Sequence, residues 1–252
     1  MKDRGGHDPH SGWTPHDGLR ADAVEALARA VLGRVAARAD LLPESPSPEF
    51  LDSFCTLLVS GDAAAAGRLL RARTARRQSY AQVADGILGS AARLLGRKWD
   101  ADALSFAEVS VAITQILRLN QAYARRPVPV TRDGAPRVGV FAALPGQAHS
   151  LGIVLAAEAF RQSGWKIELL LNRPERDVVE VIRRLRPEIV GLTVSVEDRP
   201  GRLSPLVHAL NRLPYRVPVL LGGTGAATVA PALPSGQHVR VVTDIVSALN
   251  AV

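Results

Sequence analysis

Two hydrophobic periodicities follow one another along the chain. Between residues 49 and 126, apolar residues recur at the spacing of amphipathic helices. From residue 137 onward, continuous apolar runs alternate with helical segments. The first pattern predicts packed helices, and the second is typical of a parallel sheet that helices cover on both faces.

Four helices are expected in the first region. Asp62 is expected to cap the second helix, and Ser105 with Glu108 to form a capping box at the start of the fourth. Gly61 is expected to end the first helix. Four helices with short joints favour a bundle. The expected helices cover residues 50–61, 62–77, 80–99 and 105–124.

Five strands are expected in the second region. Their alternation with helices predicts an α/β fold in which a four-helix bundle precedes a flavodoxin-like, doubly wound, five-stranded parallel sheet. Such a sheet binds ligands beyond the carboxyl ends of its strands, where the strand order reverses. The expected strands cover residues 138–144, 166–171, 188–195, 217–223 and 239–244.

The remaining segments complete the division of the chain. The first 18 residues hold three of the six histidines, but they have no cysteine and no regular spacing, so a flexible tail is favoured over a metal site. One amphipathic helix is expected after this tail. The tail and this helix cover residues 1–45, and a helical-bundle cap domain covers 46–126. A linker at 127–136 then leads to the flavodoxin-like domain at 137–252.

Composition and charge narrow the class of protein. The net charge is +7, with basic runs at 67–78 and 183–186, which would attract an acidic protein surface or nucleic acid, although a solvated helix face is the simpler interpretation. The single Cys55 rules out an internal disulfide, and its apolar context favours a buried thiol. No apolar run has the length of a membrane span or the form of a signal peptide, so a cytoplasmic protein without membrane contact is expected.

Three turns with small residues are expected to meet at the carboxyl edge of the sheet. They read GQAHSLG after the first strand, LTVS at the end of the third and LGGTG after the fourth. The first turn places His149 where a phosphate-binding loop would place glycines, which favours a metal-centred cofactor. From the residues alone, a histidine that is merely hydrogen-bonded in a loop is an equally good interpretation.

These motifs, in this order after a helical bundle, resemble the cobalamin-binding modules of methionine synthase, corrinoid carrier proteins and cobalamin-dependent regulators. The resemblance implies base-off, His-on cobalamin, with His149 as the lower axial ligand of cobalt in place of the benzimidazole base. Gly152 would then let the displaced nucleotide tail pass, Thr193 would stand beside the tail, and Gly222 with Gly223 would lie against it. Imidazole is a suitable ligand for such a metal.

A second motif, KWDADALSFAEVSVA, resembles the bundle motif in which a tryptophan covers the upper corrin face. Trp99 takes that position, and ordinary packing of a large apolar ring is the alternative interpretation. The Glu-His pair of adenosyl-binding light sensors falls at Val109 and Ser110, so the polar cap over an adenosyl group is missing. Glu108 is expected to serve as a helix cap instead.

Two departures from the family pattern affect the lower site. Gln147 replaces the aspartate that orients the histidine, and its amide still accepts a proton from the ring but does not raise the basicity of His149 as a carboxylate does. Weaker or more exchangeable ligation is therefore expected. Ser195 replaces the leucine of the motif after the third strand. Its small hydroxyl, like that of Thr193, is expected to donate a hydrogen bond to the cofactor or to accept one from it.

No catalytic constellation is readable, so the chain is not expected to be an enzyme. The first 45 residues are too short for a helix-turn-helix reader, and direct contact with DNA is left open. Among relatives that have a long, variable N-terminus, no DNA-binding domain and a neutral residue ahead of the histidine, the chain resembles the AerR/PpaA type of antirepressor. That resemblance implies a cobalamin-binding photoreceptor that binds a DNA-binding transcriptional repressor of photosynthesis genes and relieves repression.

Three alternatives stay open at this point. The first is a corrinoid methyl-carrier protein of a methyltransferase system, which Gln147 disfavours because such a carrier needs firm control of cobalt. The second is a sensor that binds heme through His149. The third is a domain that has lost its cofactor and only scaffolds a partner.

Overall fold

The fold is described from a computed structural model of the chain. The expected tail and helix at residues 1–45 lie outside the described residues, as does most of the expected linker. The structure describes residues 46–252 apart from 75–77, 125–135, 148, 197, 199 and 237.

The described residues from Pro48 to Ala124 form the predicted helices. Asp62 caps the second of them, since its carboxylate accepts a hydrogen bond from the backbone N–H of Ala65 at 2.8 Å. The chain turns away from the first helix at Gly61, whose φ of +77° favours glycine. The helices are α2 (Pro48–Val59), α3 (Ala63–Arg73), α4 (Tyr80–Val83), α5 (Ser90–Asp100) and α6 (Phe106–Ala124).

The third expected helix contains a π-helical stretch that the periodicity did not predict. This stretch, η1 (Ala84–Gly89), joins α4 to α5. It buries Ile87 and Leu88 in the same core as residues of α7 and α11. A π-helix is rare. Here the irregular turn lies where the helical bundle packs against α7 and α11.

The fourth helix begins as predicted. The backbone N–H of Ser105 donates to the Glu108 carboxylate at 2.8 Å, and the backbone N–H of Glu108 donates to the Ser105 hydroxyl at 3.3 Å. This is the expected capping box. Glu108 is therefore engaged as a helix cap, as the sequence indicates.

Five parallel strands form one sheet in the order β2-β1-β3-β4-β5, which confirms the predicted α/β fold. All residues of β3 are buried, and β1 is buried beyond its first residue, as expected of apolar strands covered on both faces. The strands are β1 (Val138–Ala143), β2 (Lys166–Leu171), β3 (Ile189–Thr193), β4 (Val219–Gly222) and β5 (Val239–Val241).

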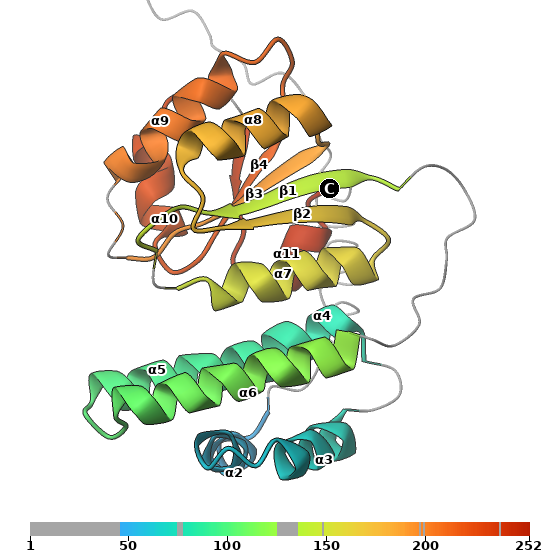
Figure 1. Ribbon diagram of the computed structural model, residues 1–252, viewed down its shortest axis with the longest axis vertical. Helices are drawn as coiled ribbons and strands as arrows, with labels where there is room; N and C mark the ends of the chain where they lie inside the picture. Colours follow the sequence, from blue (N-terminus) through green and yellow to red (C-terminus); the bar gives the residue numbers. More distant parts are fainter. Residues whose placement is uncertain are drawn as a thin grey trace, which may run out of the picture. The chain divides into compact units, whose positions relative to one another are not determined.

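Helices cover both faces of the sheet (Figure 1). On one face, α8 (Glu175–Leu185), α9 (Pro200–Asn211) and α10 (Ala226–Val229) pack against the strands. On the other face lie α7 (Leu151–Gln162) and α11 (Ile245–Leu249). The sheet is doubly wound, and the strand order reverses between β1 and β3.

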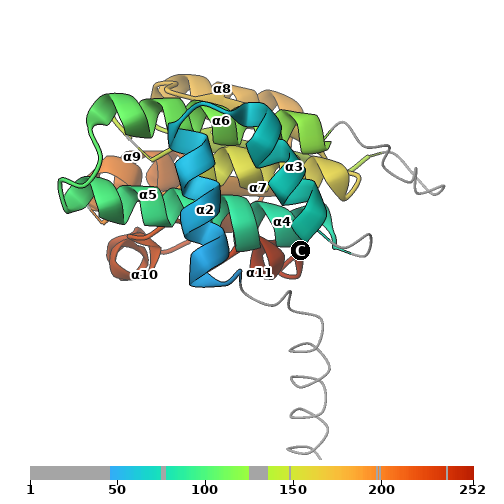
Figure 2. The same cartoon turned by 90° about the horizontal axis from the view of Figure 1, so that it is seen from below.

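Helix α7 lies between the sheet and the bundle, and α2 and α3 lie on the far side of α5 and α6 (Figures 1 and 2). It buries Phe160 against the sheet and Leu155 in the core of the bundle. Residues 44–252 consequently form one compact unit. The domain boundary expected at the linker stays a prediction.

The buried thiol is confirmed. Cys55 lies in the bundle core, with its Sγ 3.7 Å from the carbonyl oxygen of Ala91. Burial raises the pKa of this thiol to about 11, which keeps it protonated and unreactive at neutral pH. Within the described residues, no helix is long and apolar enough to cross a membrane.

The double burial of α7 leads to a stability prediction. Leu155→Ala is expected to lower the free energy of unfolding by about 2–5 kcal/mol, because it leaves a cavity in the core that α7 shares with the bundle. The control is Leu171→Ala on the edge strand, where the side chain is exposed. Urea unfolding followed by far-UV circular dichroism measures both, and equal losses would contradict the shared core.

Candidate functional site

The candidate site lies at the carboxyl ends of β1, β3 and β4. The reversal of strand order between β1 and β3 places the crevice of a doubly wound sheet there. Three segments follow these strands, namely residues 144–150, 194–198 and 223–225. The structure therefore brings together the three turns that the sequence singles out.

His149 lies in the first segment, two residues before α7 begins, and its side chain is exposed. No hydrogen-bond partner of its ring is found among the residues that the structure describes. A Cβ built on Gly152 meets nothing within 4 Å, so space is open beside the first turn of α7. The same loop therefore presents an exposed imidazole at His149 and unfilled space beside Gly152.

Gln147 is held firmly at the base of the same segment. Its Oε1 accepts a hydrogen bond from the backbone N–H of Leu144 at 2.7 Å, and its Nε2 donates to the carbonyl oxygen of Thr193 at 2.7 Å. A third bond at 3.2 Å joins Nε2 to the carboxylate of Asp198. Only one lone pair of Oε1 is left for a further donor such as an imidazole N–H.

Thr193 and Ser195, on and directly after β3, are both buried. The backbone N–H and the hydroxyl of Ser195 donate to Asp198 at 2.9 Å and 3.2 Å. The predicted role of the two hydroxyls beside a bound tail stays a prediction. In this structure Ser195 serves to hold a carboxylate.

Asp198 and Arg202 are functional candidates that the sequence reasoning missed. They form an ion pair at 3.0 Å, in which the aspartate side chain is only 4% exposed. The available signal was an acidic residue three positions after Ser195 with an arginine four positions further on. That spacing alone does not tell a buried pair from a surface pair.

The glycines after β4 have a structural reason that the sequence did not reveal. A Cβ at Gly223, where φ is +101°, would lie 2.2 Å from the carbonyl oxygen of Val194. A Cβ at Gly225 would lie 2.1 Å from that of Ser195, whereas Gly222 has a nearest neighbour at 3.5 Å. The turn after β4 therefore packs backbone to backbone on the segment after β3, and contact of Gly222 and Gly223 with a ligand stays a prediction.

Trp99 lies near the end of α5. Figures 1 and 2 both place the α5–α6 turn toward the same end as α9 and α10. Trp99 is 45% exposed, and Phe106 at the start of α6 is 74% exposed. Exposed aromatic rings at one end of a helical bundle are notable, because large apolar side chains are usually buried. Phe106 was not singled out from the sequence.

Val109 and Ser110, where light sensors that bind an adenosyl group carry a polar pair, offer no carboxylate or imidazole. Val109 is half-buried and Ser110 exposed on the first turns of α6. The nearby Glu108 is engaged with Ser105. None of these three residues therefore offers a free carboxylate or imidazole at the position of the polar pair.

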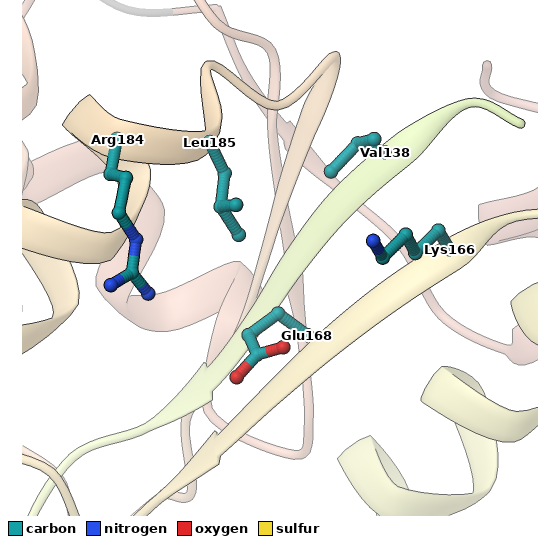
Figure 3. A pocket seen from close by; sticks show the side chains of 5 residues that line it. All are labelled: Val138, Lys166, Glu168, Arg184 and Leu185. Carbon is teal, nitrogen blue, oxygen red and sulfur yellow. The ribbon is translucent and has the colours of Figure 1, made fainter. Parts of the chain in front are cut away.

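A separate hollow lies at the opposite edge of the sheet (Figure 3). It is lined by Val138 and Lys166 at the amino ends of β1 and β2, together with Glu168, Arg184 and Leu185. Ligands of doubly wound sheets bind at the carboxyl ends of the strands. This hollow is therefore not part of the candidate site.

The donor set restricts the kind of metal that the site can hold. Among the described residues, no three His, Cys, Asp or Glu side chains gather closely enough to bind a metal ion. His149 can supply one nitrogen, and its exposed ring is open to a large planar group. A metal bound here would have to bring most of its own ligands, as the cobalt of a corrin and the iron of a porphyrin do.

Comparison with known proteins supports a corrin at this site. Residues 137–249 match the family model of the B12 binding domain. The chain contains a B12-binding domain. The match covers all five strands and includes His149, Gly152 and the turns after β3 and β4.

Two relatives are similar to part of this chain. The chain is 31% identical to the HTH-type transcriptional repressor CarH of Myxococcus xanthus over 137 residues, which are 52% of this chain and 44% of CarH. It is 28% identical over 157 residues to an uncharacterized 20.5 kDa protein in the bchF-crtJ intergenic region of Rhodobacter capsulatus, covering 60% and 80% of the two chains. The chain thus spans less than half the length of CarH.

A solved structure supports the fold. The monomethylamine corrinoid protein of Methanosarcina barkeri superposes with a TM-score of 0.62 at 16% identity, over 81% of this chain and 96% of the other. At this identity the similarity shows the fold alone. It agrees with the fold that the sequence predicts.

The close packing of the last turn leads to a second prediction. Gly225→Ala is expected to lower the free energy of unfolding by about 1–3 kcal/mol, because its Cβ would overlap the backbone of Ser195 although φ is an ordinary −92°. Gly96→Ala is the control, since nothing lies within 4 Å of its Cβ and alanine favours a helix. Urea unfolding compares the two, and an unchanged Gly225→Ala protein would contradict the backbone contact.

Proposed function

We propose that this protein is a cobalamin-binding, light-responsive cytoplasmic regulator that binds a DNA-binding transcriptional repressor and relieves repression of photosynthesis genes. The observation that carries the proposal is the B12-binding domain whose exposed His149 has open space beside it at Gly152. The similarity to the repressor CarH, and to a protein named after its place between bchF and crtJ, supports a regulatory role.

The described residues fit a corrin held in the base-off, His-on manner. His149 would hold the cobalt from below, and Gly152, Thr193, Gly222 and Gly223 would line the path of the nucleotide tail. When bound, cobalamin would supply a cobalt centre whose ligand exchange could respond to light. The chain would supply one imidazole nitrogen, from His149, to that cobalt.

The bundle supplies the other side of the proposed site. Trp99, and with it Phe106, would cover the upper face and shield it from solvent, because both rings are exposed at one end of the bundle. The missing polar cap at Val109 and Ser110 favours a small upper ligand over adenosyl. Each face of the cofactor then meets a different layer of the protein.

Control of partner binding would follow from this arrangement, in which the bundle and the sheet contact different faces of the cofactor. A change of upper ligand alters contacts with the bundle only, and a ligand shifts a conformational equilibrium only through such a difference. The Arg-rich surface of α3, with Arg68 and Arg71 described, offers a basic face to an acidic partner patch. Exposed ion pairs of this kind are weak singly and fade with salt.

A corrinoid carrier is the second candidate. The monomethylamine corrinoid protein shares this fold over nearly its whole length, so the fold suits a carrier as well as a regulator. Gln147 disfavours it, because an amide does not raise the basicity of a ligating histidine as a carboxylate does. The regulator is therefore preferred.

Removal of the axial ligand tests the cofactor site. His149→Ala protein, incubated with hydroxocobalamin and desalted in the dark, is expected to retain at least about tenfold less cobalamin, since even an outer partner of a ligand is worth that much. His208→Ala is the control, because this imidazole is exposed on α9 and its Nδ1 lies 3.0 Å from the carbonyl oxygen of Ser204, outside the candidate site. Full retention by His149→Ala with an unchanged spectrum would contradict the assignment, and uptake of heme alone by the wild type would favour the heme sensor.

Partner capture tests the output. Illuminated holoprotein is expected to recover a DNA-binding repressor from a cell lysate in a different yield from dark or cofactor-free protein, as judged by mass spectrometry. Recovery of a methyltransferase would support the carrier instead. The same partner at equal yield in every state would support a scaffold without cofactor control.

A further inference from the structure

The segment that carries His149 is anchored by a single amide side chain. Gln147 joins the end of β1, through the N–H of Leu144, to the end of β3, through the carbonyl oxygen of Thr193. It also donates to Asp198 in the segment before α9. Both partners of its Nε2 are acceptors, so this position requires a donor.

Asp198 is itself fixed from several sides. It accepts from the backbone and hydroxyl of Ser195 and pairs with Arg202 at 3.0 Å. Burial by itself raises the pKa of Asp198, but the hydrogen bonds from Ser195 and Gln147 and the charge of Arg202 lower it overall. The carboxylate therefore stays ionised at neutral pH and remains an acceptor for Gln147.

Arg202 extends this contact to the turn just before Gln147. A Cβ on Gly146, where φ is +78°, would lie 3.4 Å from both terminal nitrogens of the Arg202 guanidinium. The guanidinium thus lies against the backbone of the turn while it pairs with Asp198. Residues 144–147 are held by one amide, one carboxylate and one guanidinium.

His149 depends on this anchor because its ring has no hydrogen-bond partner among the described residues. Its placement is set by the backbone on its two sides, namely Gln147 before it and Leu151 at the start of α7. We propose that Asp198 is a positioning residue for His149, acting through the amide of Gln147. This inference rests on the proposed function.

The inference explains why this chain has an amide where related modules carry aspartate. An acidic side chain at position 147 would face the Thr193 carbonyl and the Asp198 carboxylate, and both would repel it. The carboxylate is instead supplied by Asp198 in the segment after β3, which reaches the His149 segment through Gln147. Replacing Gln147 by an acidic residue should therefore weaken cobalamin binding, although it brings the sequence closer to the family motif.

The test uses an isosteric change with a matched control. Gln147→Glu keeps the shape and removes the donor. Gln162→Glu removes the same kind of donor away from the site, since Gln162 donates to the Ala124 carbonyl at 2.6 Å and to Glu158 at 2.9 Å. Asp198→Asn keeps one acceptor oxygen but loses the charge that pairs with Arg202.

Two measurements are made on the full chain. In dark titrations with hydroxocobalamin followed by absorption, Gln147→Glu is expected to bind about 10- to 100-fold more weakly, Asp198→Asn to fall between it and the wild type, and Gln162→Glu to stay near the wild type. In the cofactor-free protein, amide hydrogen exchange of residues 144–150 is expected to rise in the first two variants only.

Every outcome decides the inference. Wild-type affinity, spectrum and exchange in both Gln147→Glu and Asp198→Asn would overturn it, and so would equal effects in Gln162→Glu, which would show general destabilisation. If the wild type binds no cobalamin, the proposed function fails. The exchange comparison then still shows whether Asp198 and Gln147 fix the segment that carries His149.

Discussion

Helix α7 is packed on both of its faces, and the rest of the molecule depends on this double burial. Toward the sheet, Phe160 meets the rings of Phe141 and Trp165 edge-on, with centroids 4.9 Å and 5.5 Å apart. Toward the bundle, Leu155 and Ala159 enter the core of the helices. Because α7 begins two residues after His149, the packing of both layers fixes one end of the candidate binding loop.

The other end of that loop is fixed by polar contacts at the edge of the sheet. The backbone of the turn after β4 reaches the segment after β3 only because Gly223 and Gly225 have no side chains. The same segment holds Asp198, a buried carboxylate with a complete set of donors. Apolar packing therefore places the layers, while a small hydrogen-bonded network orients the residues of the site.

A site with one available imidazole nitrogen suits a cofactor that carries its own metal and most of its ligands. The division of labour in the proposed function follows from this. The sheet would grip the lower side of a planar ring through a loop that is fixed at both ends, and the bundle would meet the upper side with exposed aromatic rings. A signal that alters only the upper side of the cofactor would then change its contacts with the bundle and not those with the sheet. Such a difference in contacts is what a ligand needs in order to shift a conformational equilibrium.

The sequence by itself determined the elements and their order, because hydrophobic periodicity follows directly from which faces of a helix or strand are buried. It also determined the helix caps at Asp62 and Ser105 and the place of His149 at the carboxyl edge, since these depend on neighbours along the chain. Only the tertiary structure decided the π-helical turn of η1, the backbone contact at Gly225 and the partnership of Gln147 with Asp198. Those features depend on contacts between residues far apart in sequence, where spacing carries no information about distance.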